Sequence, residues 1–140
     1  MTAAGASGAP APASDRRERG IAAYATIFGV SEQELPAAFA ARVGPVFAEE
    51  ALQAAGGAAW SHPALTGRDR SIAIITALTA QGVTGDRLRG HVELAVRHGL
   101  DEDALTALMT LLAVYVGYAH ASLAMESLRT TFASSPQDGA

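Results

Sequence analysis

The sequence predicts an all-α protein, a single-domain bundle of helices. Hydrophobic residues make up 49% of the 140 residues, but many of them are alanine, which buries little area and favours helix. Apolar residues recur at helical spacing through most of the chain, and no stretch shows the alternation of a half-buried strand. Aromatic residues make up only 6%, so each contributes much of the large-volume packing.

Charge and composition exclude several functional classes. The formal net charge of −4 argues against a broad nucleic-acid surface. Because there is no cysteine, disulfides, thiolate metal sites and redox thiol pairs are excluded. The longest apolar run, Leu111 to Ala119, is too short to span a bilayer. We therefore expect a soluble, cytoplasmic protein with no membrane or nucleic-acid partner.

The ends of the chain differ in composition from its middle. Residues 1–14 are rich in Ala, Gly, Pro and Ser and lack the basic start and apolar block of a signal peptide. We expect a disordered tail there, a helical domain over residues 15–133, and a loose polar tail over residues 134–140. Ser14 has the residue type and position to cap the first helix, which is expected to end at Gly29.

A second long helix is predicted from about Pro36 to Ala54. Ser31 and Glu34 have the spacing of a capping box before it, and Gly44-Pro45 is expected to kink or divide it. Glu49 and Glu50 lie near its C-terminal end, where the helix dipole disfavours anions. They are either a solvated pair, or one of them faces a pocket as a proton donor or acceptor.

The glycines Gly56-Gly57 predict a break, followed by a loop over residues 58–67. Trp60 in this loop is either a plug of the core or the wall of a pocket. His62 is held extended by the following Pro63 and is either a surface residue or part of a site.

The next predicted helix, residues 68–81, is apolar on nearly all sides and is expected to be buried on several of them. Arg68 and Arg70 lie in its first turn, where the helix dipole disfavours cations. Either they pair with a carboxylate such as that of Asp69, or a guanidinium is kept there to bind a substrate carboxylate in bidentate fashion.

His91 lies on the apolar stripe of a helix expected from Gly85 or Asp86 to His98, with Thr84 as its cap. Its neighbours on the stripe, at i, i+3, i+4 and i+7 spacing, are Leu88, Val92 and Ala95. His91 is therefore either a buried histidine bonded to a backbone carbonyl or a general acid or base. His98-Gly99 is typical of a helix end, which makes His98 structural.

Two more helices are predicted, one beginning at Asp101 and one running from about Tyr118 to Phe132, with a kink or break at Gly117. Their Met and Leu stripes indicate core or subunit interface, and His120 is expected at the surface or interface. The four histidines share no metal-ligand spacing, and the sequence contains no phosphate-binding, dinucleotide-binding or metalloprotease motif. Metal binding is unsupported.

Several motifs occur in one order along the chain: Trp60 with Pro63 and Leu65, Arg70-Ser71, His91-x3-Ala95-x3-Gly99-Leu100, and Tyr115-x-Gly117. With these motifs, residues 36–132 resemble the carboxymuconolactone decarboxylase family, of the alkylhydroperoxidase D-like fold. The resemblance implies an all-α fold of about six helices, assembled as a homotrimer or homohexamer. It also implies a site near subunit contacts that uses no organic cofactor and no metal. The redox branch uses a CxxC pair that is absent here, so thiol peroxidase chemistry is not inherited.

The resemblance also implies roles for individual residues. His91 falls on the family's histidine and Arg70 on its arginine, and we take these two as the catalytic pair. His91 is the acid that protonates carbon, and Arg70 is the anchor of the substrate carboxylate. The remaining candidates are expected to bind substrate: Arg68, Trp60, His62 and Tyr115.

Three positions depart from the pattern of the family. Ala107 stands where glutamate is frequent, Ala119 where proline is frequent, and His62 where decarboxylases tend to carry arginine. We therefore expect a changed substrate in a cofactor-free, lyase-like enzyme that acts through an enolate on a carboxylated lactone or β-keto-type compound. The alternatives are a non-decarboxylating relative (an isomerase, a lactone-processing enzyme or a dehydratase) and a non-catalytic oligomeric binding protein.

Overall fold

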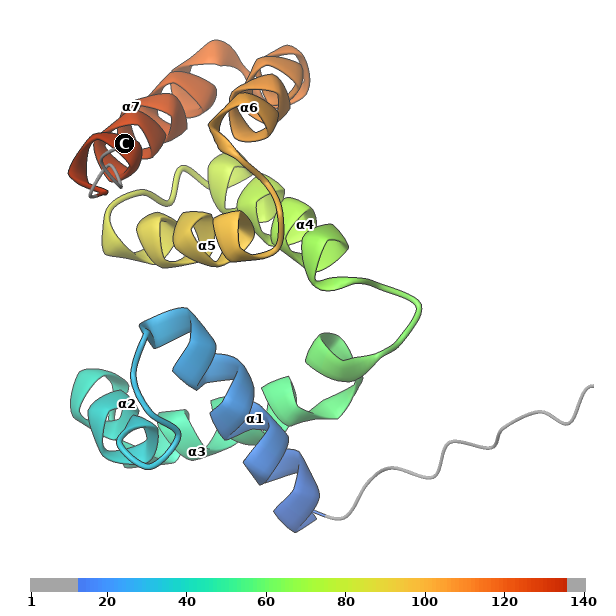
Figure 1. Ribbon diagram of the computed structural model, residues 1–140. Helices are drawn as coiled ribbons and strands as arrows, with labels where there is room; N and C mark the ends of the chain where they lie inside the picture. The colour runs from blue at the N-terminus through green and yellow to red at the C-terminus, as the bar shows by residue number, and fades with distance from the viewer. Residues whose placement is uncertain (1–12, 136–140) are drawn as a thin grey trace, which may run out of the picture. The chain divides into compact units, whose positions relative to one another are not determined.

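The structure, a computed structural model, describes residues 13–135 and is all-α within that range, as predicted (Figure 1). It contains seven α-helices where about six were expected. The predicted tails fall largely on residues 1–12 and 136–140, which lie outside the described residues. The elements are α1 (Ala13–Phe28), α2 (Leu35–Val43), α3 (Pro45–Ala54), the π-helical segment η1 (Ala55–Ala59), α4 (Gly67–Ala80), α5 (Asp86–Arg97), α6 (Glu102–Val116) and α7 (Tyr118–Ser134).

The chain divides into two compact units, one ending at His62 and one beginning at Pro63. The first unit contains α1, α2, α3 and η1. Its core is formed by Ala25, Leu35, Phe39, Ala48 and Leu52. The rings of Tyr24, Phe28 and Phe39 contact one another beside it, with centroids 4.6 to 6.0 Å apart. Much of the aromatic content therefore lies in this small core.

Helix α1 lies directly on the backbone of α3 and η1, and two glycines permit this. A Cβ added to Gly20 would collide with the carbonyl oxygen of Leu52, and one added to Gly56 would collide with that of Arg16. Arg19 Nε also donates to the Gly56 carbonyl at 2.8 Å. The contact is therefore one of backbone against backbone, which any side chain at either glycine would prevent.

Gly44 divides the second predicted helix into α2 and α3. Its φ of 88° is a conformation that residues with a Cβ rarely adopt, and Pro45 then begins α3 as its first residue. Gly117, with φ of 95°, separates α6 from α7 in the same way. Both divisions were among the outcomes that the sequence predicted.

The predicted break at Gly56-Gly57 is present as a kink. Gly57 has non-helical backbone angles (φ −80°, ψ −157°), and the helical pieces on its two sides meet there. The Gly56 carbonyl next to it accepts from Arg19, and α1 lies against Gly56. The chain is helical again through Trp60 and Ser61, so the loop that follows is shorter than predicted.

The second unit contains α4 to α7, and Figure 1 shows α6 and α7 side by side over α4 and α5. Its core is built from all four helices. Helix α4 is less enclosed than its composition predicted, because only one stripe is buried: Ser71, Ile75 and Thr79. The largest fully buried side chains of the unit are Ile75, Leu88, Leu100, Leu105, Met109 and Leu128.

The cap predicted for α5 is also wrong. Gly85, with φ of 67°, is the residue that precedes the first turn, and no side chain caps it. Thr84 lies one position too early to accept from the second or third amide of the helix. The bounds of α5 otherwise agree with the prediction to within a residue.

Candidate functional site

The first turn of α4 is built by Thr66 and Asp69. Thr66 Oγ1 accepts from the Asp69 N–H at 3.1 Å, and the Asp69 carboxylate accepts from the Thr66 N–H at 2.9 Å. These bonds lower the pKa of Asp69, and the charges of Arg68 and Arg70 lower it further. The carboxylate therefore lies between the two candidate anchors and offsets the unfavourable position of their charges at the helix start.

The two candidate anchors differ in what they contact. Arg70 donates from Nη1 to the carbonyl of Leu65 at 2.6 Å, so part of its guanidinium is held by the segment before α4. Arg68 is exposed and makes no hydrogen bond or ion pair to residues 13–135. A guanidinium offers five N–H donors, so both side chains keep donors for an anion.

His91 lies on α5, which packs beside α4. Its side chain is half-buried, next to the fully buried Leu88 and Val92. Nδ1 is buried and has no hydrogen-bond partner, the single such side-chain nitrogen or oxygen within residues 13–135. Burial lowers the pKa of His91. The structure therefore does not bond this nitrogen to a backbone carbonyl, which was one of the two readings of the sequence.

The buried nitrogen defines how His91 interacts chemically. A protonated ring would place an N–H donor at Nδ1 with no acceptor, which is costly in a buried position. The neutral ring with its proton on Nε2 leaves only a lone pair unsatisfied. Burial therefore favours the neutral ring of His91, with its proton on Nε2.

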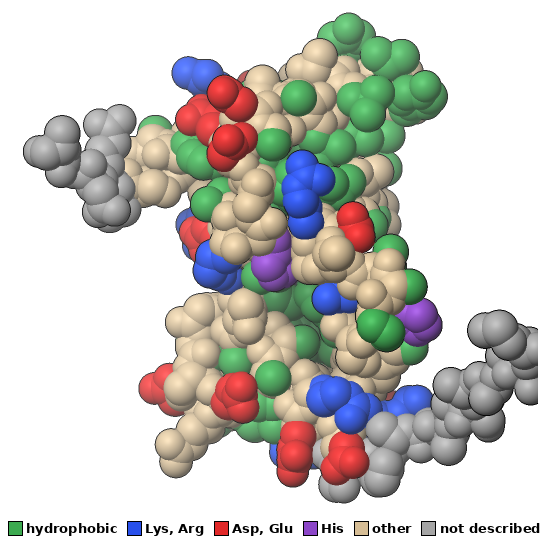
Figure 2. Space-filling view, turned by 45° about the vertical axis from the view of Figure 1, so that its right-hand side comes forward, with side chains coloured by type: hydrophobic (Ala, Val, Ile, Leu, Met, Phe, Trp, Pro, Cys, Tyr) green, Lys and Arg blue, Asp and Glu red, His purple; other side chains and the backbone are tan. Residues whose placement is uncertain are grey.

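Tyr115 lies near the C-terminal end of α6 and is 80% exposed. A side chain in that position cannot exclude water from a cavity in an isolated chain. Figure 2 shows hydrophobic side chains gathered on the second unit where α6 meets α7. We call this group the α6–α7 patch; its residues are Leu111, Val114, Tyr115 and Tyr118, each more than half exposed.

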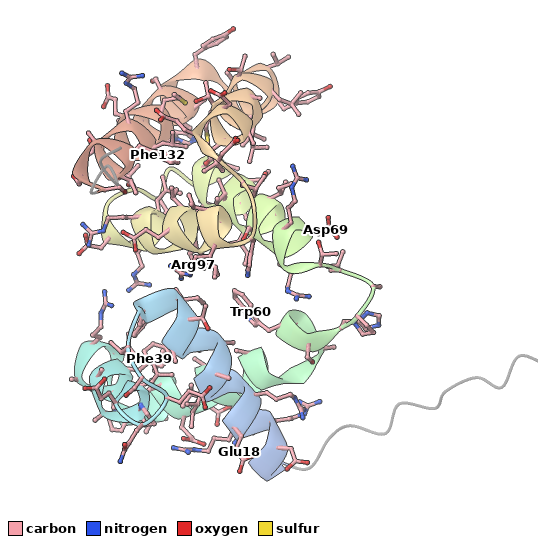
Figure 3. The ribbon with its side chains drawn as sticks, in the orientation of Figure 1. Glu18, Phe39, Trp60, Asp69, Arg97 and Phe132 are labelled. Carbon is pink, nitrogen blue, oxygen red and sulfur yellow. The ribbon has the colours of Figure 1, made fainter. Side chains whose placement is uncertain are left out.

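Trp60 and His62 belong to the unit that ends at His62, whereas the other four candidates belong to the unit that begins at Pro63. Trp60 is half-buried and lies in the helical turn after η1, as Figure 3 shows. His62 is exposed, and its N–H donates to the Ala58 carbonyl at 3.1 Å. Within the second unit the structure brings together α4, with Arg68 and Arg70, and α5, with His91.

Glu49 is not a free proton donor. Its carboxylate accepts from Arg17 Nε at 3.0 Å and from Gln53 Nε2 at 3.2 Å. The bond from Arg17 is the main cause of its lowered pKa. Glu49 therefore stays ionised and ties α1 to α3, while Glu50 is exposed. This corrects the reading in which one of the two faces a pocket.

A groove of about 310 Å³ lies between the start of α5 and the second half of α7, but its lining includes neither His91 nor either candidate arginine. Within residues 13–135, no group of three or more His, Asp or Glu side chains is placed to hold a metal ion. In the same range, no helix has both the length and the apolar character needed to cross a bilayer.

Comparison with protein families gives a match to the carboxymuconolactone decarboxylase family over residues 45–130, more than half of the chain. The chain belongs to this family. No curated protein and no solved structure matches the chain. The match begins at the first residue of α3, so α1 and α2 lie outside it.

The range that matches the carboxymuconolactone decarboxylase family, residues 45–130, contains all of the candidate site residues, which lie between Trp60 and Tyr115. The chain has no cysteine, so it cannot carry out chemistry that needs a thiol pair. The position of Ala107, where the family often has glutamate, is exposed on α6. No carboxylate at that position is available to orient a histidine or a substrate.

Sequence reasoning missed one pair of residues. Ser71 Oγ and His98 Nδ1 lie 2.9 Å apart, and they join α4 to the end of α5. The motif Arg70-Ser71 identified Ser71 only as a mark of the family, and His98 was interpreted as a helix end. Nothing in their spacing of 27 residues signals a contact, because it depends on how two helices cross.

Proposed function

We propose that this protein is a cofactor-free enzyme of the carboxymuconolactone decarboxylase family that acts through an enolate on a carboxylated lactone or β-keto-type substrate. One observation supports this most directly. His91, on the residue pattern of the family, has a buried Nδ1 without a partner and a lowered pKa. An imidazole used only to hold a core together would normally have its buried nitrogen bonded.

The reaction needs three components. The bond between the carboxylate carbon and its neighbour breaks, its electron pair moves into the conjugated carbonyl to form an enolate, and CO2 leaves. A proton is then added to the carbon that lost CO2. An arginine holds the carboxylate, the substrate itself takes up the electrons, and a general acid supplies the proton, a contribution of about 10²–10⁴ in rate.

Arg70 and Arg68 are the proposed anchors, and His91 is the proposed acid. A bound substrate carboxylate near His91 stabilises the imidazolium, so substrate binding raises the pKa that burial lowers. The proton is then taken up from solvent when substrate is present. In the absence of a substrate anion the neutral ring is suited to act as a base, which is the role it would have in a non-decarboxylating isomerase or dehydratase.

Homo-oligomeric assembly, as a homotrimer or homohexamer, is part of the proposal. The α6–α7 patch supports it, because an exposed group of two tyrosines and two aliphatic residues is unusual on a monomer surface. Tyr115 belongs to this patch, so its proposed role as a pocket wall requires a neighbouring copy. The site would then be completed at a contact between copies.

The rival function is a non-catalytic oligomeric binding protein. Its support is the absence of a carboxylate at Ala107 together with the histidine at position 62. It requires His91 to be a structural residue, and such a residue is expected to have a bonded ring nitrogen. The unbonded Nδ1 of His91 favours the enzyme.

The deciding experiment compares the wild type with His91→Ala on a panel of carboxylated lactones and β-keto acids. CO2 release, loss of substrate absorbance and the shift in Tm are measured for each compound. We expect one class of compound to be turned over and to raise the Tm of the wild type, with turnover abolished in His91→Ala. If no compound binds or reacts and His91→Ala only lowers the Tm, the binding-protein function replaces the enzyme.

A further inference from the structure

Ser71, which is buried, and His98, which is half-buried, form a contact between α4 and the end of α5. Ser71 Oγ lies 2.9 Å from His98 Nδ1, and Ser71 is only 2% exposed. A hydroxyl so enclosed cannot reach a substrate, so the pair is not a nucleophile with its base. It is a hydrogen bond of ordinary length between the beginning of one helix and the end of another.

Gly67 is the second part of this contact. It is the first residue of α4, and a Cβ added to it would lie 2.9 Å from Cε1 and from Nε2 of His98. Gly67 is not among the glycines with positive φ, so its backbone would accept alanine. The glycine is therefore needed for space, because the imidazole of His98 lies against the start of α4.

His98 also has a fixed relation to His91. His91 lies on α5 and His98 is the residue that directly follows this helix, seven positions later. That spacing is two helical turns, so their Cα atoms lie on the same side of α5, about 10 Å apart along the axis. The first turn of α4, which carries Arg68 and Arg70, thus contacts α5 two turns beyond His91. The distance between the arginines and His91 depends on where this contact forms.

We propose that Ser71 and His98 are positioning residues, which fix the first turn of α4, and with it Arg68 and Arg70, relative to His91. The inference rests on the proposed function, in that the arginines hold the substrate carboxylate. Displacing a positioned group by about 1 Å can cost up to a hundredfold in rate. The hydrogen bond between Ser71 and His98, and the contact of the His98 ring with Gly67, lie next to the turn that carries the two arginines. They are suited to prevent such a displacement.

His120 offers a matched control. Its Nδ1 lies 3.1 Å from the carbonyl oxygen of Ala80, and a Cβ added to Gly82 would lie 3.2 Å from its Nε2. A second histidine therefore contacts the opposite end of α4 in the same manner. His120→Ala removes an equivalent contact without touching the turn that carries the arginines.

The first experiment tests the contact itself and needs no substrate. We expect Gly67→Ala to lower the Tm of the wild type, because its Cβ displaces the His98 ring. In a His98→Ala background we expect the same change to leave the Tm unchanged or to raise it, since alanine is favoured over glycine in a helix. If Gly67→Ala has the same effect in both backgrounds, the ring does not contact the start of α4 and the proposal fails.

The second experiment tests positioning, at a temperature where every variant is folded. With a carboxylated substrate identified, we expect His98→Ala and Ser71→Ala to lower kcat/KM by about tenfold to a hundredfold, mainly through a rise in KM, because the arginines bind the substrate carboxylate. We expect His98→Asn to restore KM, because its amide overlies the position of Nδ1 and can bond Ser71. His120→Ala should leave KM unchanged.

The outcomes separate the two proposals. If the wild type turns over substrate and His98→Ala leaves KM unchanged, His98 is purely structural and the positioning role is wrong, while the proposed enzyme stands. An equal rise of KM in His120→Ala and His98→Ala also contradicts it, because general loosening would then explain both. If the wild type neither binds nor converts any compound, the proposed function fails and the positioning role fails with it.

Discussion

Thr66 and Asp69 bond to each other twice at the start of α4, once through each backbone N–H. The reciprocal bonds satisfy two amides that a helix otherwise leaves free. The bonds from Thr66 are the main cause of the lowered pKa of Asp69, and the charges of Arg68 and Arg70 lower it further. The helix start can therefore carry two cations and still begin at a defined residue.

We expect Thr66→Ala to reduce the free energy of unfolding by about 1 kcal/mol. The reason is the loss of the hydroxyl that accepts from the Asp69 N–H. Denaturant unfolding measures the change. Thr84→Ala is the matched control, since Thr84 precedes α5 without capping it, and it should have almost no effect. Equal losses in the two variants would show that the cap at α4 contributes nothing specific.

The pKa of His91 predicts a pH dependence of stability. Burial lowers it below the ordinary value of 6.5, so the unfolded chain binds the proton more tightly than the folded one. The stability linked to neutral His91 is therefore complete above pH 6.5 and is lost as the pH falls through the lower, folded value. In the wild type, the free energy of unfolding should decline as the pH falls from about 7.5 to about 5.5. In His91→Leu, we expect the part of this decline that comes from His91 to be absent.

The same His91→Leu variant should be close to the wild type in stability at pH 8, within about 1 kcal/mol, because it also removes an unsatisfied buried nitrogen. Glu34, Glu49 and Asp69 have lowered pKa values, so their contributions are lost in a separate, more acidic range. A wild-type stability that rises as the pH falls from about 7.5 to about 5.5 would contradict the neutral state of His91.

The close contact of α1 with η1 predicts that alanine substitutions at two adjacent glycines have very different effects on stability. Gly56→Ala should destabilise the protein by about 3 kcal/mol, because its Cβ meets the carbonyl oxygen of Arg16 and the backbone must move. Gly57→Ala should change stability by less than about 0.5 kcal/mol, since its Cβ would lie 3.5 Å from Arg16 Nη1, an ordinary contact. Thermal and denaturant unfolding check both, and similar losses would show that α1 does not contact Gly56.

The α6–α7 patch predicts self-association. We expect Tyr115→Ser combined with Tyr118→Ser to lower the oligomeric state measured by sedimentation or light scattering, because two exposed rings are removed. Ala107→Ser, at an exposed position elsewhere on α6, should leave it unchanged. If the wild type is monomeric at high protein concentration, the α6–α7 patch is not an interface between copies of this chain.

Some of the structure could be predicted because it depends on neighbours in the chain. Gly44 and Gly117 end helices through their own backbone conformation, and Ser31 bonds to Glu34 three residues away. The stripe that holds His91 beside Leu88 and Val92 follows from helical spacing alone. These features need no knowledge of which helix lies against which.

Other features were decided by contacts between distant segments. Gly56 has no room for a side chain because the backbone of α1 lies against it, and Glu49 is ionised because Arg17, 32 residues away, bonds to it. The contact between Ser71 and His98 depends on how α4 crosses α5.

By itself, the sequence determined the all-α class, the helix divisions at Gly44 and Gly117, and the family, since these depend on composition, spacing and local backbone preference. Only the tertiary structure decided that His91 keeps a nitrogen without a partner, that Tyr115 faces solvent, and that His98 lies against Gly67. The physical reason is that burial and hydrogen bonding of a side chain are set by whichever segment lies opposite it, and a helical repeat specifies the face of a helix but not its neighbour.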